Sequence, residues 1–285
     1  MGTVAGALAV ARGLGVDRLD AQLLLAHRLG CSRAWLMAHD DAPLDDADGQ
    51  ALTAMFLRRA AGEPLAYVVG QREFHGLELR VTPDVLVPRP DTETLVDWAL
   101  EILSGPLQGV EAPRVVDLGT GSGAIALALK HACPRAQVHA SDVSAAALAV
   151  ASDNGARLQL PVCWYQGDWW RALPVTELAQ VDLVLANPPY IRPGDPHLAD
   201  LRHEPLSALV ARDDSGDGLA DIERIVGGSR GRLRAGGWLL LEHGFEQASA
   251  VCKRLLLNGF SDIVTRRDMA GRLRVSGGRF DALDR

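Results

Sequence analysis

The spacing of apolar and polar residues changes twice along this chain of 285 residues. Near the N-terminus, apolar residues recur loosely every three or four positions, which is typical of short amphipathic helices. The apolar groups lie at residues 19–25, 35–37 and 52–57, and an aspartate-rich break separates the second from the third. This pattern predicts a helical N-terminal domain over residues 1–66.

The pattern becomes β-like after Pro64. Residues 67–69 and then Phe74, Leu77 and Leu79 place β-type side chains in short alternating runs around two glycines. We predict a β-hairpin that acts as a connector, over residues 67–90.

Predicted strands and helices alternate over residues 91–285. A helix capped by Asp91 or Thr92 is followed by the strand RVVDLG, a helix, the strand QVHASDV, a second helix and the strand VDLVLANPP. The strand GGWLLLEHG, another helix and a closing antiparallel pair beginning near Ile263 complete the chain. Such alternation predicts an α/β domain with a doubly wound, mostly parallel sheet covered on both faces.

Composition narrows the possible classes of protein. Hydrophobic residues make up 48% and charged residues 23%, which predicts a folded globular chain. The net charge is −7, and the chain has only two lysines, so it lacks the basic face typical of a duplex-DNA binder. The apolar runs are too short for a membrane helix, and no signal peptide is recognisable. We therefore expect a cytoplasmic protein that does not bind membranes or nucleic acid directly.

Cysteine and histidine spacing gives no sign of a metal site. The four cysteines lie far apart, no CxxC pair occurs, and no histidines are spaced as zinc ligands. We expect reduced thiols and no metal.

A glycine-rich stretch follows the first strand of the α/β domain. In VVDLGTGSGAIALAL, Gly119, Gly121 and Gly123 alternate with Thr120 and Ser122 after Asp117. Glycine has no Cβ, so the backbone can turn sharply and lie against a ligand. GxGxG is one residue short of the GxGxxG of dinucleotide sites and favours a nucleoside cofactor. A tight turn with a purely structural role is the alternative.

Acidic residues follow the next two strands. Asp142 ends the second strand, where a doubly wound domain places a carboxylate that accepts ribose hydroxyls. It could instead cap the following helix, although Ser144 could fill that role. Farther on, QGDWW presents Asp168 and Trp169, which could contact a base, whereas Trp170 is expected in the core.

The stretch LVLANPPYIRP ends a buried strand with Asn187, Pro188, Pro189 and Tyr190. Two prolines stiffen the turn and remove two backbone donors, so its carbonyl groups remain as acceptors. The side-chain oxygen of Asn187 and the carbonyl of Pro188 could each accept one hydrogen of a planar NH₂ group, with Tyr190 packed on its face. The nitrogen would then face the methyl group of S-adenosylmethionine. A strand-terminating loop is the structural alternative.

Taken with these motifs, the chain resembles the HemK/PrmC family, the protein-(glutamine-N5) methyltransferases that modify class 1 peptide chain release factors. The resemblance rests on segments along most of the chain: EPLAYVVGQREFHGLELRVTPDVLVPRPDTETLV, VVDLGTGSGAIALAL, DWW, NPPYI, HEPLSALVARDDSGDGL and LLLEHG. PRPDTE before the glycine loop and NPPY after it form a specific combination, whereas NPPY alone also occurs in adenine-N6 methyltransferases.

The resemblance implies a class I S-adenosylmethionine-dependent methyltransferase domain with a seven-stranded sheet, preceded by a helical domain and a β-hairpin. It implies methyl transfer to the glutamine of the Gly-Gly-Gln motif in a release factor, with S-adenosylhomocysteine as the other product. Cofactor contacts would come from the loop Gly119 to Gly123 and from Asp142, Trp169 and Asn187. Asn187 and Tyr190 would be catalytic, and Asn187 to Tyr190 would hold the glutamine; Phe74 and Arg89 would shape the pocket.

Two other functions remain open at this point. An adenine-N6 DNA methyltransferase would place a flipped base in the same corner, but it would need a basic recognition surface. Residues 1–90 hold nine arginines, no lysine and eleven acidic residues, which favours a protein partner. A noncatalytic nucleoside-binding module, in which NPPY is only a loop, is the second alternative.

Overall fold

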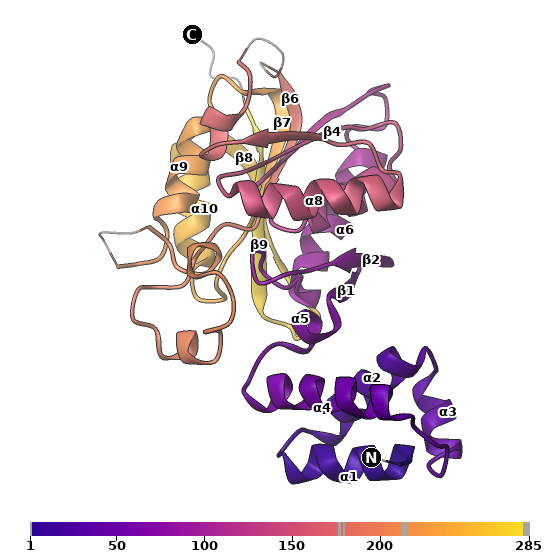
Figure 1. Cartoon of the computed structure of the whole chain (residues 1–285). Helices are drawn as coiled ribbons and strands as arrows, with labels where there is room; N and C mark the ends of the chain where they lie inside the picture. Colours follow the sequence, from indigo (N-terminus) through magenta and orange to yellow (C-terminus); the bar gives the residue numbers. More distant parts are fainter. Residues whose placement is uncertain (1, 176–177, 179, 213–215, 282–285) are drawn as a thin grey trace. The chain divides into compact units, whose positions relative to one another are not determined.

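The computed structural model describes residues 2–175, 178, 180–212 and 216–281. The chain forms two compact units, Met1–Gln71 and Arg72–Arg285 (Figure 1). Part of the segment HEPLSALVARDDSGDGL, residues 213–215, and the last four residues of the predicted methyltransferase domain lie outside the described residues.

The N-terminal unit is helical. Its helices are α1 (Val4–Gly13), α2 (Arg18–Leu29), α3 (Arg33–Ala38), α4 (Asp46–Ala60) and α5 (Leu65–Val69). The first four begin at a side chain that accepts a backbone N–H of the first turn, from Thr3, Asp17, Ser32 and Asp45. The predicted apolar groups lie in α2, α3 and α4, while α1 was not predicted from its weak pattern.

The prediction of strand structure at residues 67–69 is wrong, because these residues belong to helix α5. Val68 packs into the apolar core of the helical unit, so burial overrides the β propensity of the sequence. The hairpin is shorter than predicted and consists of β1 (Gln71–Phe74) and β2 (Leu77–Arg80). His75 and Gly76 have φ values of 49° and 77°, the positive values that a two-residue hairpin turn requires.

The second unit contains a seven-stranded sheet, as the resemblance implied. The strands are β3 (Arg114–Leu118), β4 (Gln137–Asp142), β5 (Cys163–Gln166), β6 (Val181–Ala186), β7 (Leu233–Glu242), β8 (Phe260–Arg267) and β9 (Leu273–Phe280). Their order is β5-β4-β3-β6-β7-β9-β8, with β9 antiparallel to both neighbours and the pairs from β5 to β7 parallel. The predicted closing antiparallel pair is confirmed.

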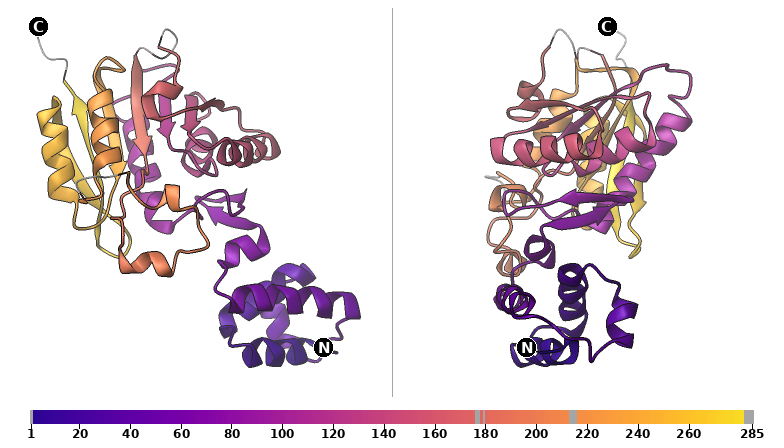
Figure 2. Two further views of the ribbon diagram at one scale, coloured as in Figure 1. Left: turned by 60° about the vertical axis from the view of Figure 1, so that its left-hand side comes forward. Right: turned by 45° about the vertical axis from the view of Figure 1, so that its right-hand side comes forward.

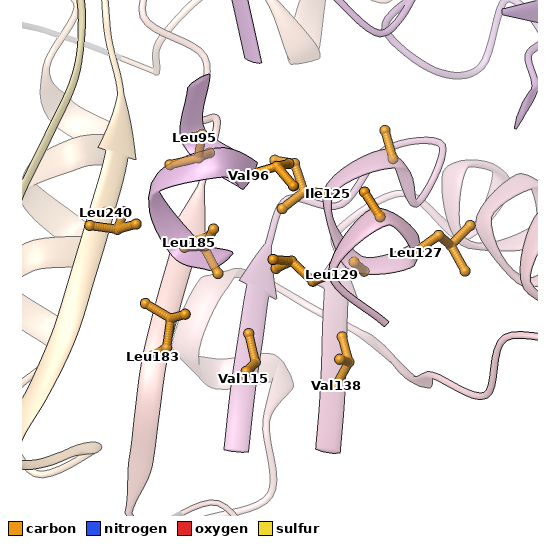
Figure 3. Packing of buried hydrophobic residues seen from close by; sticks show 14 of the residues in the cluster. Leu95, Val96, Val115, Ile125, Leu127, Leu129, Val138, Leu183, Leu185 and Leu240 are labelled. Atoms are coloured by element: carbon orange, nitrogen blue, oxygen red, sulfur yellow. The ribbon is translucent and has the colours of Figure 1, made fainter. Parts of the chain in front are cut away.

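Helices cover both faces of this sheet (Figure 2). One face packs against α6 (Glu93–Ser104) and α7 (Ala124–Ala132), through residues such as Leu95, Ile125 and Leu185 (Figure 3). Leu158 of α8 (Ala145–Leu158) joins this core. The other face packs against α9 (Ala220–Gly228) and α10 (Ala248–Leu257). Helix α9 was not predicted.

In the described part of the chain, no helix has the length and apolar character needed to cross a membrane.

The strand order changes direction at the boundary between β3 and β6. The chain runs outward from β3 through β4 to β5 and then returns to place β6 on the other side of β3. Ligands of doubly wound sheets bind beyond the carboxyl ends of the strands at such a switch point. The fold therefore places the glycine loop after β3 beside the turn after β6.

Close packing between α9 and Trp170 provides a test of this fold. A Cβ added at Gly228 would lie 2.1 Å from the indole Cδ1 of Trp170, whereas at Gly227 nothing lies within 4 Å. Gly228→Ala should lower the free energy of unfolding by about 1–3 kcal/mol through overpacking. Gly227→Ala, the matched control, should be neutral or stabilise by about 0.5–1 kcal/mol. Urea denaturation measures both, and equal stability of the two variants would contradict this packing.

Candidate active site

The carboxyl ends of four parallel strands meet at one edge of the sheet. Register pairs Leu118 of β3 with Ser141 of β4 and with Ala186 of β6, and pairs Ala186 with Leu241 of β7. Across the sheet, the next residues are Asp142, Gly119, Asn187 and Glu242. The register thus places the predicted acidic residue, the glycine loop and the amide side by side, together with a glutamate that the sequence analysis did not single out.

A cavity of about 290 Å³ lies at this edge. The predicted site residues in its wall are Gly119, Thr120, Gly121, Ser122, Asp142, Trp169, Asn187 and Pro189. Gly123, Pro188 and Tyr190 are not part of the wall: Gly123 caps α7, Pro188 is buried, and the Tyr190 hydroxyl bonds to Glu242. The volume is close to the lower end of the range for small-molecule sites.

The glycine loop turns tightly around the end of β4. The backbone N–H groups of Gly119 and Thr120 both donate to the carbonyl of Ser141, at 2.8 and 2.9 Å. Gly119 has φ +76°, and a Cβ there would lie 2.9 Å from the Trp169 ring. Glycine is therefore required at this position both for its backbone conformation and for the close approach of the indole.

Asp142 fastens this loop to β4. One carboxylate oxygen accepts the N–H of Gly121 and the other accepts the N–H of Ser144, each at 2.9 Å. The helix cap comes from Ser144, whose hydroxyl accepts the N–H of Ala147 at 3.2 Å. A carboxylate has about four lone-pair sites, so Asp142 retains acceptor capacity toward the cavity.

The two tryptophans after β5 have different environments. Trp170 is 7% exposed and donates to the carbonyl of Ile225 at 2.8 Å, which confirms its predicted core position. Trp169 lines the cavity with φ +47°, a strained conformation for a bulky residue. Its indole N–H donates to the buried carboxylate of Asp221 at 3.0 Å, which holds the ring in place. Asp168 also lines the cavity and pairs with Arg224.

Asn187 belongs to a chain of hydrogen bonds. Its Nδ2 donates to the hydroxyl of Thr92 at 3.2 Å, and this hydroxyl donates to Glu242 Oε2 at 2.6 Å. The hydroxyl of Tyr190 donates to the other oxygen, Oε1, at 3.2 Å. The predicted side-chain cap of α6 is wrong, because Thr92 stands at the cap position but uses its hydroxyl for Glu242, and Asp91 pairs with Arg274.

A second buried glutamate connects two segments that contribute to the cavity wall. Glu204, with its side chain 2% exposed, accepts the backbone N–H of Val87 and a guanidinium N–H of Arg89. This ties the loop that carries Pro205 and Ser207, both in the cavity wall, to the segment before α6. Phe74 and Arg89, which the resemblance implied as pocket residues, also line the cavity.

The roles of Thr92, Glu204, Asp221 and Glu242 are not evident from the sequence. Each lies inside or next to a segment that carries the resemblance, except Asp221, but no spacing rule connects them. Thr92 and Glu242 are separated by 150 positions and meet only through the packing of α6 against the sheet.

Buried carboxylates dominate the electrostatics of the site. Burial raises the pKa of Asp117 to about 7, although the Thr120 hydroxyl donates to it at 2.6 Å. Burial also raises the pKa of Glu242 to about 7 and the pKa of Asp142 above its usual range. Desolvation, with Glu242 nearby, raises the pKa of Tyr190, so a phenolate base is disfavoured. No group of three or more potential metal ligands occurs among the described residues.

The strand order of the sheet, the glycine loop after β3 and the carboxylate of Asp142 together define a class I methyltransferase domain. Enzymes of this class use S-adenosylmethionine. The profile of the PrmC N-terminal domain matches residues 5–70, and that of the methyltransferase small domain matches residues 92–203. The chain belongs to the family of release factor glutamine methyltransferases, as its relatives show. The relative from Bordetella pertussis is 52% identical over 266 residues, covering 93% of this chain and 95% of its own.

More distant relatives agree with this assignment. The release factor glutamine methyltransferase of Escherichia coli K12 is 43% identical over 92% of both chains. A solved methyltransferase from Pyrococcus furiosus has a TM-score of 0.53 at 16% identity and covers 81% of this chain and 98% of its own. The N-terminal domain of human METTL16, solved with S-adenosylhomocysteine, also has a TM-score of 0.53, at 18% identity and 84% coverage of both chains. These two structures show the fold alone.

The raised pKa of Asp117 predicts a pH-dependent stability. Because the folded state binds this proton more tightly than the unfolded state, the stabilisation is present below about pH 4 and is lost as pH rises through about 7. At roughly 1.4 kcal/mol per pKa unit, the loss has an upper bound of about 4 kcal/mol. Asp117→Asn should therefore lose less stability than the wild type between pH 5 and pH 8 in urea titrations. Parallel profiles would contradict the prediction.

Proposed function

We propose that this protein transfers a methyl group from S-adenosylmethionine to the side-chain amide nitrogen N5 of the glutamine in the Gly-Gly-Gln motif of peptide chain release factors. The observation that carries the proposal is the position of Asn187 in the wall of the same cavity as the glycine loop and Asp142. The names of the relatives, which are 43–52% identical over nearly the whole chain, supply the substrate.

The cavity fits a nucleoside cofactor. Asp142 stands where it can accept ribose hydroxyls, and Trp169 covers Gly119 at the same wall. Apolar side chains, among them Ile125, Val143 and Ala147, supply a surface for a flat base. Gly119 to Ser122, Asp142, Trp169 and Asn187 would hold the cofactor, and Gly123, outside the wall, would support the loop where it enters α7.

The amide of the substrate would bind at the turn after β6. Asn187 Oδ1 would accept one hydrogen of the glutamine NH₂ group at the cavity wall, where Pro189 adds a rigid apolar surface. The carbonyl of Pro188, a buried residue outside that wall, is the proposed acceptor of the second hydrogen. The hydroxyl of Tyr190 donates to Glu242, and this bond would hold the turn after β6 in place. Tyr190 would therefore position the turn and not react with the substrate. When bound, S-adenosylmethionine would supply an electrophilic methyl group: the N–C bond would form as the S–C bond breaks, sulfur would keep the electron pair of that bond, and one amide proton would pass to solvent.

Magnitudes indicate how the rate is raised. Amide resonance is of the order of the ~18–20 kcal/mol rotation barrier of a peptide bond. Two hydrogen bonds of roughly 0.5–1.5 kcal/mol each cannot remove it. Positioning the nitrogen in line with the methyl group contributes up to ~7–11 kcal/mol, and the sulfonium group supplies intrinsic reactivity. The main task of Asn187 is therefore to aim the nitrogen.

The N-terminal region, predicted as a domain of residues 1–66, would dock the release factor. Its acidic balance suits a protein partner better than duplex DNA, and no observation favours the adenine-N6 or noncatalytic alternative. A release factor acts in translation, which fits the cytoplasmic location expected from the sequence.

Substitution of Asn187 tests the proposed reaction. Asn187→Ala should lower the rate of labelled methyl transfer to a purified release factor by about 100-fold or more, because the nitrogen is no longer aimed. Asn258→Ala, the same chemical change at a residue outside the cavity wall, should leave the rate unchanged. A release factor with Gln→Ala in its Gly-Gly-Gln motif should accept no label. Label on duplex DNA, or on the Gln→Ala factor, would overturn the proposal.

A matched pair of glycines tests the cofactor site. Gly119 and Gly194 have φ of +76° and +79°, but only at Gly119 would a Cβ meet the Trp169 ring. Gly119→Ala should weaken binding of S-adenosylhomocysteine at least about tenfold, since both the loop and the ring must shift. Gly194→Ala should bind it as the wild type does. Isothermal titration calorimetry measures both, and equal dissociation constants would argue against this cofactor position.

A further inference from the structure

The hydrogen bonds behind Asn187 link three distant segments of the chain. Thr92 lies at the end of the 3₁₀ turn Pro90–Thr92 before α6, Asn187 follows β6, and Glu242 ends β7. Thr92 and Glu242 are 4% and 1% exposed. A buried, directional chain of this kind can transmit the protonation state of one end to the other.

The number of available hydrogens determines which group donates in each hydrogen bond between Glu242, Thr92 and Asn187. A threonine hydroxyl has one hydrogen, and the 2.6 Å bond to Glu242 Oε2 uses it. Toward Asn187, Thr92 can therefore only accept, and its partner must be the NH₂ end of the carboxamide, 3.2 Å away. The amide oxygen, Oδ1, has no hydrogen bond to another described residue and remains available in the cavity wall.

We propose that Glu242, acting through Thr92, is a positioning residue that sets which end of the Asn187 carboxamide faces the substrate nitrogen. The inference rests on the proposed function, because an amide substrate needs an acceptor at this place. Ionised Glu242 draws the Thr92 hydrogen toward itself and so holds Asn187 with Oδ1 toward the substrate.

Protonation of Glu242 reverses the arrangement. The carboxylic acid can donate its hydrogen to Thr92, whose own hydrogen is then free to donate to Asn187 Oδ1. The carboxamide turns over and presents its NH₂ group to the NH₂ group of the glutamine. Two donors then face each other, and the substrate nitrogen loses the one of its two proposed acceptors that lies in the cavity wall. Methyl transfer therefore requires ionised Glu242.

The charged and titratable groups that face Glu242 come from three directions. Tyr190 donates to it from the turn after β6, Arg274 lies on β9, and Asp91 lies in the turn before α6. Arg274 is held between Asp91 and Asp268, at 3.1 Å from each. Burial raises the pKa of Glu242 to about 7, against the hydrogen bond from Thr92 and the charge of Arg274. The adjacent His243 bonds to Ser276 and to the carbonyl of Gly244.

Thr92 provides a conservative and a disruptive substitution. Thr92→Val keeps the size of the side chain but removes the hydroxyl, and it should lower kcat at least about tenfold. Thr92→Ser keeps the hydroxyl and should retain kcat within about threefold. Both variants should bind S-adenosylhomocysteine within about threefold of the wild type. A wild-type kcat in Thr92→Val, or an equal defect in Thr92→Ser, would overturn the inference.

The pH profile tests Glu242 itself. In the wild type, kcat should fall about tenfold per unit as pH decreases below about 7, since only the ionised form is active. Glu242→Gln cannot titrate, so it should have a lower kcat at pH 8 and no such decrease; thermal melting confirms that it folds. An unchanged decrease in Glu242→Gln would show that another group is responsible.

A spectroscopic measurement separates this inference from the proposed function. The side-chain NH₂ signals of Asn187, assigned by their loss in Asn187→Ala, should shift between pH 6 and pH 8 in the wild type but not in Glu242→Gln. This readout needs no substrate. A wild type that shifts but methylates no release factor would refute the function alone, whereas an active wild type without the shift would refute the coupling.

Discussion

The parallel register of β3, β6 and β7 is the constraint on which the site depends. Because Leu118 pairs with Ala186, and Ala186 with Leu241, the residues that follow these strands meet at one edge. A shift of one residue would turn Asn187 away from the glycine loop, since neighbouring residues of a strand point to opposite faces. Apolar packing on both faces holds this register, as Leu183, Leu185 and Leu240 face α6 and α7 (Figure 3).

Close contacts and strain are concentrated around the cavity. Trp169 keeps a positive φ because its indole is held by Asp221 and packed on Gly119, where no side chain could fit. The neighbouring Trp170 packs against α9 at Gly228. These contacts place a large aromatic ring at the cavity wall without relying on a flexible loop, which suits a site that must hold two reactants in line.

The buried carboxylates near the site lower the stability of the folded protein, because they are removed from water. Asp117, Asp142 and Glu242 are desolvated, and each is compensated only in part by hydrogen bonds or by Arg274. In the proposed mechanism none of them removes a proton from the substrate. Asp142 shapes the loop and the cofactor site, while Glu242 orders the carboxamide that binds the glutamine. Charge is thus used to orient neutral groups.

Local patterns in the sequence predicted the alternation of strands and helices in the second unit apart from α9, together with the glycine loop, Asp142 and the Asn-Pro-Pro-Tyr turn, because each depends on residues close together in the chain. Three features could not be predicted from local patterns: the helix at residues 65–69, helix α1 with its weak apolar pattern, and the role of Thr92. Burial decided the first, and a hydrogen bond across 150 positions decided the last. Only the tertiary structure brought Glu242 behind Asn187, because strand register, which no short stretch of sequence encodes, sets that contact.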